Sequence, residues 1–466
     1  MSEEQSVVDL QGQLALSPME EGAQSGQLLL VIGAGPKAIA IAAKRAVLAK
    51  LGRPVPRVVI VDYQGVAAHW SGSAGFTDGR QLLGTRPEKD IGFPYASTLW
   101  GCIPLNKAID KEMYLLSWYT YLIDQGTYSD WVDRGRTRPT HGEWSRYIQW
   151  VAARIEIDIR IAKVQAISTI MDGTRWQLSC VGGEGQSYLL EGDGLVLTGP
   201  GTPLTIPGQP ASHPRVWDGA NFWLHLAELS RQRDTTTEPL NIGVIGTGET
   251  AAAIVVALSN TLQEAAFIEV ISPYGVLYSR DEGFAENRLF SDPDGRLANL
   301  HGNHRHELNW LSLSENDRRE FVRRTDRGVF SMHAVEELNL AENVRSVLGT
   351  ARSLQASTEK VRVEMEYGGN IEQDEYDYVI VARGFNALWF TALLDAATHA
   401  RLGNATAAFD RNMLECAIGE DLSIQGFQPR LHLPMLAGVA QGPGFPNLSC
   451  LGLLSDRILS SYVAAK

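Results

Sequence analysis

The first clear hydrophobic pattern in the chain is an apolar run that ends abruptly in glycine. Leu28–Ile32 is long enough for a buried strand, and the glycine-rich stretch 33–37 separates it from the alanine-rich stretch Ala38–Lys50. A second strand-like stretch, Arg57–Asp62, follows; its residues 58–61 are apolar and it ends in an acid. A strand, a tight turn, a helix and a second strand in this order predict a βαβ unit of an α/β fold.

The residues at the turn are those of a dinucleotide-binding fingerprint, Gly-x-Gly-x-x-Ala. Gly33 permits the turn, Gly35 lets the backbone approach a pyrophosphate, and Ala38 lets the helix pack closely on the strand. An acid in the position of Asp62 is placed to accept the hydroxyl groups of an adenosine ribose. We therefore expect a nucleotide to be bound by Gly33, Gly35, Pro36, Lys37, Ala38 and Asp62.

The same pattern returns about 210 residues later, which makes the signal far more specific. A strand, Leu240–Ile245, leads into Gly246-Thr247-Gly248-Glu249-Thr250-Ala251 and a helix of small residues. The following strand, 267–271, has no acid at its end, and an acid there would repel a 2′-phosphate. Arg280 is the nearest candidate phosphate partner in the sequence, so NADPH is favoured while NADH stays open. We expect this second nucleotide to contact Gly246, Gly248, Glu249, Thr250 and Arg280.

Polar and irregular stretches divide the rest of the chain. Short strand-like runs end at a Gly/Pro-rich break near residue 200, and residues 280–327 are polar and irregular. The fold class is therefore α/β, with two Rossmann-like dinucleotide-binding domains and a small, mainly helical substrate-binding insertion. The expected division is a disordered tail over 1–26, a first domain over 27–205 and 375–466, a second over 206–279 and 335–374, and the insertion over 280–334.

Composition narrows the function classes. A net charge of −13 disfavours nucleic acid and anionic membrane surfaces as partners. No apolar run reaches the ~18 residues of a spanning helix, and the acidic start of the chain is unlike a signal peptide. The four cysteines are scattered without a Cys-x-x-Cys pair, which argues against a metal site and a redox-active disulfide and fits the cytoplasm.

Two nucleotide sites in one chain suggest tightly bound FAD and an exchangeable nicotinamide nucleotide. A disulfide reductase needs a cysteine pair beside the flavin, and the linker over 200–240 lacks the Phe-x-Gly-x-x-x-His-x-x-x-Trp motif of Baeyer–Villiger oxygenases. Of the enzyme classes that bind both FAD and a nicotinamide nucleotide, an N- or S-oxygenating enzyme or a simple reductase remains.

Longer motifs give a more specific comparison, since the chain resembles the flavin-dependent N-hydroxylating monooxygenases of siderophore assembly. It is most similar to the L-lysine N6-monooxygenases of the mycobactin and nocobactin pathways, over residues 28 to about 460. The motifs that carry the resemblance are Thr77-Asp78-Gly79, the stretch Pro87–Tyr95, the stretch Thr325–Ser331, and the stretch Gln441–Arg457. The resemblance implies that NAD(P)H reduces FAD, that O2 adds at flavin C4a, and that a neutral side-chain amine attacks the resulting hydroperoxide. The flavin then carries the chemistry, and no catalytic protein residue or metal is expected.

The resemblance also implies roles for individual residues. Lys89 would hold the substrate carboxylate, because related ornithine hydroxylases use a lysine in the matching Lys-Asp pair. Asn287 would bind the amino-acid backbone. Asp326 stands where the family has a second asparagine; as an acceptor it could bind an ammonium group but not a carboxylate. The implied substrate contacts are completed by Leu454 and Ser455.

The implied flavin contacts include Pro446, Asn447 and Leu448 from the C-terminal motif. His69 and Trp70 are further candidates, for which a packed indole and an ordinary surface histidine are the alternatives. Two departures from the ornithine enzymes stand out: Gly84 replaces a glutamine near the flavin, and Ala382-Arg383-Gly384-Phe385 replaces Ala-Thr-Gly-Tyr.

The substrate remains open from the residues alone. L-Lysine is expected, with O2 as co-substrate and a homo-oligomer as the working form. Ornithine, another amine or an acylated lysine are alternatives, because one methylene changes binding by only ~1–3 kcal/mol. A non-catalytic nucleotide-binding protein is a remote alternative.

Overall fold

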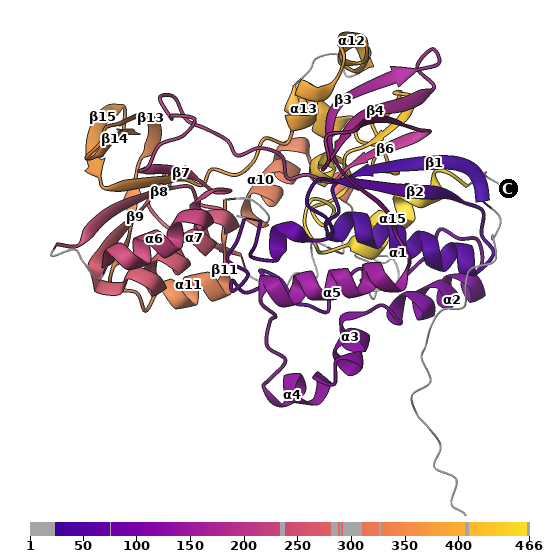
Figure 1. Ribbon diagram of the computed structural model, residues 1–466, viewed down its shortest axis with the longest axis horizontal. Helices are drawn as coiled ribbons and strands as arrows, with labels where there is room; N and C mark the ends of the chain where they lie inside the picture. Colours follow the sequence, from indigo (N-terminus) through magenta and orange to yellow (C-terminus); the bar gives the residue numbers. More distant parts are fainter. Residues whose placement is uncertain are drawn as a thin grey trace, which may run out of the picture.

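The computed structural model shows two lobes joined side by side (Figure 1). It describes residues 24–74, 76–233, 238–280, 288, 290–291, 310–325, 328–405 and 410–463. Each lobe is built on its own sheet with a glycine turn at the end of a central strand. Two Rossmann-like units were predicted from the repeated fingerprint, and the sheets confirm them.

The first lobe contains a seven-stranded sheet in the order β17-β6-β1-β2-β3-β4-β5. The strands from β17 to β3 are parallel, and β3, β4 and β5 continue as antiparallel neighbours. Figure 1 shows α1, α5 and α15 along one side of this sheet. The strands are β1 (Gln24–Ile32), β2 (Val55–Asp62), β3 (Asp158–Ile170), β4 (Arg175–Gly182), β5 (Ser187–Gly192), β6 (Gly194–Leu197) and β17 (Arg430–His432).

The helices of the first lobe come from both ends of the chain. Pro36 begins α1 without losing a backbone hydrogen bond, and a capping box of Thr140 and Glu143, a pattern within four consecutive residues, is present at the start of α5. The helices are α1 (Pro36–Lys50), α2 (Ile103–Tyr114), α3 (Trp118–Asp124), α4 (Tyr128–Asp133), α5 (His141–Arg154), α12 (Ala396–Ala405), α13 (Arg411–Cys416), α14 (Gly438–Gln441) and α15 (Leu451–Ser460), with the 3₁₀ turns η1 (Ala68–Trp70), η4 (Trp389–Leu393) and η5 (Pro434–Leu436).

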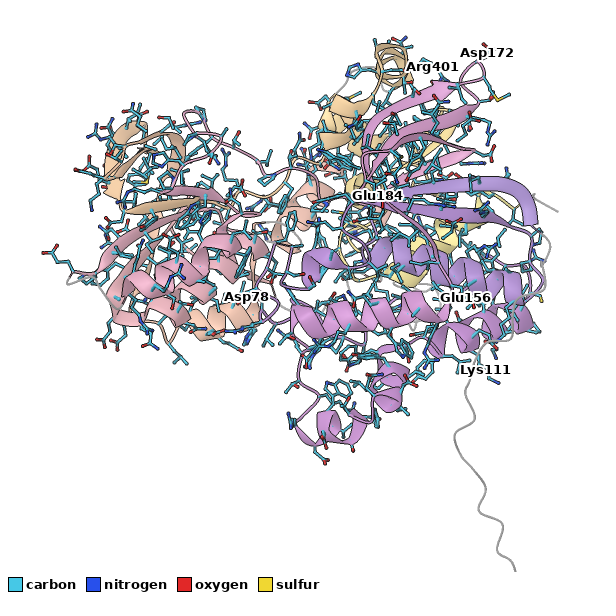
Figure 2. The ribbon with its side chains drawn as sticks, in the orientation of Figure 1. Asp78, Lys111, Glu156, Asp172, Glu184 and Arg401 are labelled. Carbon is cyan, nitrogen blue, oxygen red and sulfur yellow. The ribbon has the colours of Figure 1, made fainter. Side chains whose placement is uncertain are left out.

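C-terminal helices fix the edge of the first lobe. Arg401 on α12 donates hydrogen bonds to Thr169 and to the carbonyl of Gly173 in the turn between β3 and β4. Figure 2 shows Arg401 beside Asp172 of the same turn. A helix more than 200 residues further along the chain therefore packs on β3 and on the turn to β4.

The second lobe has a five-stranded parallel sheet in the order β12-β9-β8-β16-β7. Helices α6, α7 and α11 cover one face, and a three-stranded antiparallel sheet, β13-β14-β15, covers the other (Figure 1). The strands are β7 (Val216–Asp218), β8 (Leu240–Ile245), β9 (Ala266–Ser272), β12 (Val344–Leu348), β13 (Thr350–Ala356), β14 (Val361–Tyr367), β15 (Asn370–Tyr376) and β16 (Tyr378–Val381). The helices are α6 (Phe222–Arg233), α7 (Glu249–Leu262) and α11 (Met332–Leu338), with the 3₁₀ turn η2 (Gln263–Ala265).

The segment expected to be an inserted substrate domain lies between the lobes in Figure 1, where α10 is seen. Its described part contains η3 (Trp310–Ser312), α10 (Glu315–Thr325), and a short parallel pair of strands, β10 (Ser279–Arg280) and β11 (Phe330–Ser331).

Two linkers connect the lobes and lie against each other. Leu204 donates its backbone N–H to the carbonyl of Gly384, and Asn386 donates to the carbonyl of Thr202. Two boundaries differ from the prediction: β16 pairs with β8, so the chain leaves the second sheet after Val381 rather than at residue 375, and β1 begins at Gln24, inside the predicted tail. None of the described helices is long and apolar enough to cross a membrane.

Candidate functional site

The first glycine turn has the geometry expected for a dinucleotide. Gly33 has a φ of +98°, and a Cβ atom there would collide with the Thr198 hydroxyl. A Cβ at Gly35, by contrast, would meet no atom within 4 Å. The backbone at Gly35 and the N-terminus of α1 therefore border open space, which fits a bound pyrophosphate. Ala38 is fully buried, as close packing of helix and strand requires.

Asp62 ends β2 beside this turn, where the sequence predicted a ribose-binding acid. Its carboxylate accepts hydrogen bonds from the backbone N–H groups of Ala34 (2.9 Å), Gln64 (2.7 Å) and Gly65 (2.9 Å). A carboxylate has about four acceptor positions, so one is left by the residues that the structure describes and could accept from a ribose hydroxyl. Asp62 thus stabilises the glycine turn, a role that the sequence analysis did not assign.

The C-terminal motif lies at the N-terminal end of α1. Lys37 is buried and donates from Nζ to the carbonyl oxygen of Pro446 at 2.7 Å. Asn447 hydrogen bonds through its side chain to backbone groups of its own segment, and Leu448 packs on the core of the first lobe. Lys37 therefore joins the two stretches that were expected to meet at the flavin, although its ammonium group points at protein rather than at open space.

The long loop between β2 and α2 is organised by a buried carboxyl group. Asp90 accepts hydrogen bonds from the backbone N–H groups of Gly92 (3.1 Å) and Trp118 (2.9 Å) and from the Tyr95 hydroxyl (2.6 Å). Burial raises the pKa of Asp90 to about 6, and these hydrogen bonds oppose the shift. Lys89, the predicted carboxylate-binding residue, is half-buried and precedes this anchor directly.

His69 and Trp70 form an aromatic group on the same loop. The His69 imidazole stacks on Phe76 with ring centroids 3.8 Å apart, and Trp70 packs edge-on against His141. Burial lowers the pKa of His69, so its ring is neutral at neutral pH. Within the described residues its Nε2 atom is buried without a hydrogen-bond partner, which fits a ring that bonds to a bound nucleotide.

The second glycine turn is equally constrained. Gly246 has a φ of +146°, and a Cβ there would collide with the carbonyl of Ala382 at the end of β16. Gly248 precedes α7, and Glu249 is the first residue of that helix. The Glu249 carboxylate lies 3.5 Å from where a Cβ of Gly84 would stand. A carboxylate from the second lobe therefore lies in van der Waals range of Gly84 in the first.

Gly328, from the insertion, lies beside the same turn. The nitrogen of Gly328 lies 3.9 Å from the Cβ position of Gly248, and Thr247 lies 3.5 Å from that of Gly328. Thr250 packs against Gly219. Asn287 and Asp326, the two predicted substrate residues of the insertion, lie outside the described residues, and of Arg280 only the backbone pairing in β10 is described.

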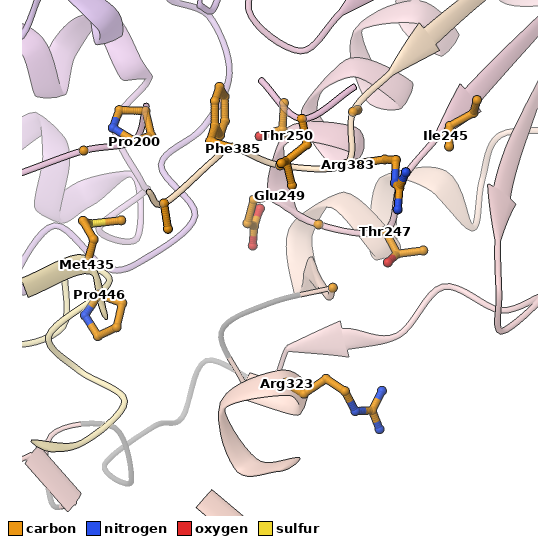
Figure 3. A pocket seen from close by; sticks show the side chains of 18 of the residues that line it. Pro200, Ile245, Thr247, Glu249, Thr250, Arg323, Arg383, Phe385, Met435 and Pro446 are labelled. Atoms are coloured by element: carbon orange, nitrogen blue, oxygen red, sulfur yellow. The ribbon is translucent and has the colours of Figure 1, made fainter. Parts of the chain in front are cut away.

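A cavity of about 670 Å³ separates the lobes (Figure 3). One part is apolar and belongs mainly to the first lobe; Figure 3 shows Pro200, Met435 and Pro446 there. The opposite part is polar and contains the second glycine turn together with Thr247, Arg383 and Arg323. This size and mixed lining suit a nucleotide or a small polar substrate.

The cavity brings together only some of the predicted site residues. Gly246, Gly248, Glu249, Thr250 and Pro446 line it. Leu454 and Ser455 do not: both are fully buried in α15, and the Ser455 hydroxyl donates to carbonyl groups of its own helix. Arg323 and Tyr274 line the cavity but were missed, because no local motif marks them.

Comparisons with known proteins give the family. The sequence profile described as L-lysine 6-monooxygenase/L-ornithine 5-monooxygenase matches residues 114–387. The chain is 40% identical over 461 residues to the L-lysine N6-monooxygenase MbtG of Mycobacterium sp. (strain MCS), which covers 94% of this chain and 95% of the relative. It is 39% identical over 444 residues to the protein of the same name from Mycobacterium tuberculosis (strain ATCC 25618 / H37Rv), with 93% and 95% covered.

Solved structures agree with this assignment. The lysine monooxygenase NbtG from Nocardia farcinica superposes with a TM-score of 0.76 at 39% identity, over 93% of this chain and 99% of that one. The reduced form of the ornithine hydroxylase PvdA from Pseudomonas aeruginosa has the same fold, with a TM-score of 0.70 at 18% identity, over 94% and 98% of the two chains. The chain belongs to the L-lysine 6-monooxygenase/L-ornithine 5-monooxygenase family.

Proposed function

We propose that this protein hydroxylates the N6 atom of L-lysine, using FAD, NADPH and O2, and so supplies a hydroxamate precursor for siderophore biosynthesis. The observation that carries this proposal is the 40% identity, over 94% of the chain, to a protein named L-lysine N6-monooxygenase. The two glycine turns and the cavity between the lobes are consistent with it, because the reaction needs a flavin and a nicotinamide nucleotide close to one substrate pocket.

The two turns divide the cofactors between the lobes. The open space beside Gly35, the N-terminus of α1 and the unsatisfied Nε2 of His69 would hold FAD. The turn at Gly246 and Gly248 would hold NADPH. Bound FAD, once reduced by NADPH, supplies the activation of O2 and the transfer of one oxygen atom to the amine.

The protein's own contribution is to position the amine and to exclude water. A protonated amine has no lone pair for the oxygen, so the pocket must accept the neutral form. The apolar part of the cavity lining, which includes Phe385 and Met435, disfavours a charged ammonium and keeps water away. Lys89 would bind the α-carboxylate, held in place by the hydrogen bonds of the neighbouring Asp90.

Product analysis tests the proposal. Purified protein with FAD, NADPH and O2 is mixed in turn with L-lysine, L-ornithine and N6-acetyl-lysine, and hydroxylamine or hydroxamate products are identified by mass spectrometry. We expect N6-hydroxylysine as the main product. Formation of hydrogen peroxide alone, or faster hydroxylation of ornithine, would contradict the proposed substrate.

Lys89→Ala tests the assigned carboxylate contact. It should raise the KM for lysine by about 10- to 100-fold, the range for a lost charge-assisted hydrogen bond, while NADPH still reduces the flavin. Lys111→Ala, at an exposed position on α2, is the matched control and should leave KM unchanged.

Self-association and a cytoplasmic location also belong to this proposal. The location rests on the scattered cysteines, all four of which are free thiols in the structure. Light scattering on the purified protein measures the oligomeric state directly.

A further inference from the structure

We propose that Arg323, held beside the ring of Tyr274, binds the 2′-phosphate of NADPH and makes the enzyme prefer NADPH over NADH. This inference rests on the proposed function, because it assumes that the second glycine turn binds a nicotinamide nucleotide. It assigns coenzyme selection to Arg323, which no sequence motif marks, in place of Arg280, the nearest candidate in the sequence.

The location follows from the topology of the second lobe. In a Rossmann unit the adenosine ribose lies at the carboxyl end of the strand that follows the glycine-turn helix. That strand is β9, which ends at Ser272. Ser272 is fully buried, and its hydroxyl already accepts hydrogen bonds from the N–H groups of Tyr274 and Gly275, both at 3.1 Å. The strand end therefore has no side chain of its own to bind a phosphate, and the residues just beyond it decide which nucleotide fits.

Tyr274 and Arg323 are those residues. The Arg323 guanidinium donates from Nη1 to the Tyr274 hydroxyl at 3.1 Å, and its Cζ atom lies 5.4 Å from the centre of the Tyr274 ring. Both side chains line the cavity that contains the second glycine turn, and Figure 3 shows Arg323 on the same side of it as Thr247. An aromatic ring with a guanidinium over it offers a stacking surface for adenine and a cation for a phosphate.

The charges around Arg323 leave it able to bind an anion. Glu320 accepts hydrogen bonds from both Arg323 and Arg324, so two cations share one carboxylate and the group keeps a net positive charge. Those bonds lower the pKa of Glu320 to about 2, and the carboxylate stays ionised at all working pH values. Arg323 uses three of its five N–H groups, two on Glu320 and one on Tyr274. Among the residues that the structure describes, its other two N–H groups have no acceptor and could bind phosphate oxygens.

The chain offers a matched control one residue away. Arg324 binds the same carboxylate from the same helix, but it is 71% exposed and does not line the cavity. Replacing either arginine removes one positive charge and breaks its pairing with Glu320, two hydrogen bonds for Arg323 and one for Arg324, so the two variants are matched in overall charge. Of the two, Arg323 is the one that contacts Tyr274, two residues beyond the end of β9.

The test measures nucleotide binding rather than turnover. Isothermal titration calorimetry on the FAD-loaded protein gives the affinities for NADP⁺ and NAD⁺ and, separately, for 2′,5′-ADP and 5′-ADP. We expect Arg323→Ala to weaken binding of NADP⁺ and 2′,5′-ADP by about 10- to 100-fold, with NAD⁺ and 5′-ADP changed less than about threefold. Arg324→Ala should change all four affinities by less than about threefold. Arg323→Lys should recover part of the loss.

A variant that gains affinity adds a test whose expected result cannot be explained by misfolding. Glu320→Gln removes the carboxylate that competes with phosphate for Arg323, so it should strengthen NADP⁺ binding several-fold and leave NAD⁺ binding unchanged.

The inference is overturned if Arg323→Ala and Arg324→Ala weaken NADP⁺ binding equally, or if Arg280→Ala and not Arg323→Ala abolishes the preference for NADP⁺. If the wild-type protein binds neither NADP⁺ nor NAD⁺, the proposed function itself has failed, and this outcome is distinct from the other two.

Discussion

A buried ion pair joins the first helix to the last and gives the strongest stability prediction. The Lys44 ammonium lies 2.8 Å from the Asp456 carboxylate, and the two side chains are 2% and 4% exposed. The same carboxylate accepts from the Trp100 indole at 2.8 Å and from the Ser97 hydroxyl at 3.1 Å. The pair connects α1, which follows the first glycine turn, to α15, which contains the end of the C-terminal motif.

Replacing only one partner of this ion pair should strongly lower the free energy of unfolding. Lys44→Met leaves Asp456 as a buried charge with two neutral donors, and removing one member of a buried pair typically costs about 3–5 kcal/mol. In a unit of this size that corresponds to a fall in Tm of roughly 6–20 °C. Lys44→Met/Asp456→Asn removes both charges while keeping an acceptor for the indole, so it should recover most of the loss.

Thermal unfolding followed by tryptophan fluorescence and flavin release measures these effects. Lys50→Met is the control: it is on the same helix and pairs with Glu112 at 2.8 Å, but the two side chains are 41% and 23% exposed, so its loss should stay within about 1 kcal/mol. The reasoning is refuted if Lys44→Met unfolds within 2 °C of the wild type, or if the double variant is as unstable as the single one.

Two further predictions concern the first lobe. Because burial raises the folded-state pKa of Asp90 from 3.8 to about 6, its contribution to stability is full below pH 3.8 and is lost as the pH rises through 6, about 3 kcal/mol in all. Asp90→Asn should remove this pH dependence, and thermal scans of both proteins from pH 4.5 to 7.5 compare the slopes; parallel slopes would contradict it. Gly33→Ala should lower both Tm and FAD content, since its Cβ would collide with Thr198, whereas Gly35→Ala should fold normally and lose only FAD, because its Cβ enters open space. The bound FAD is read from its absorbance, and equal Tm losses in the two variants would argue against this distinction.

The local parts of the fold could be predicted from the sequence because their signals are local. Each glycine turn follows an apolar strand and precedes a helix of small residues, so neighbouring positions carry the whole pattern. The capping box at Thr140 is another such signal. The position of β16 was misjudged because a short apolar strand fits either sheet, and only its pairing with β8 decides between them.

The contacts that shape the site could not be predicted, because their partners are far apart in the chain. Lys37 bonds to Pro446 and Lys44 to Asp456, each across more than 400 residues, and no pattern within either segment indicates the other. The same holds for Glu249, which fills space beside Gly84 from the opposite lobe. A substitution near one glycine turn can therefore be compensated from a distant helix.

The coenzyme site shows what such long-range placement achieves. The sequence indicated that the end of β9 lacks an acid, so a 2′-phosphate would not be repelled there. The absence of repulsion does not by itself provide a favourable contact with the phosphate. The positive charge is that of Arg323 on α10, in the segment expected to bind substrate. Its hydrogen bond to Tyr274 holds it near the end of β9. If Arg323 holds the phosphate there, NADPH connects the second lobe to the inserted segment, and Gly328, three residues beyond the end of α10, lies beside the second glycine turn. Coenzyme binding and the arrangement of the substrate segment are then coupled, so Arg323→Ala should raise the KM for lysine as well as for NADPH, whereas Arg324→Ala should raise neither.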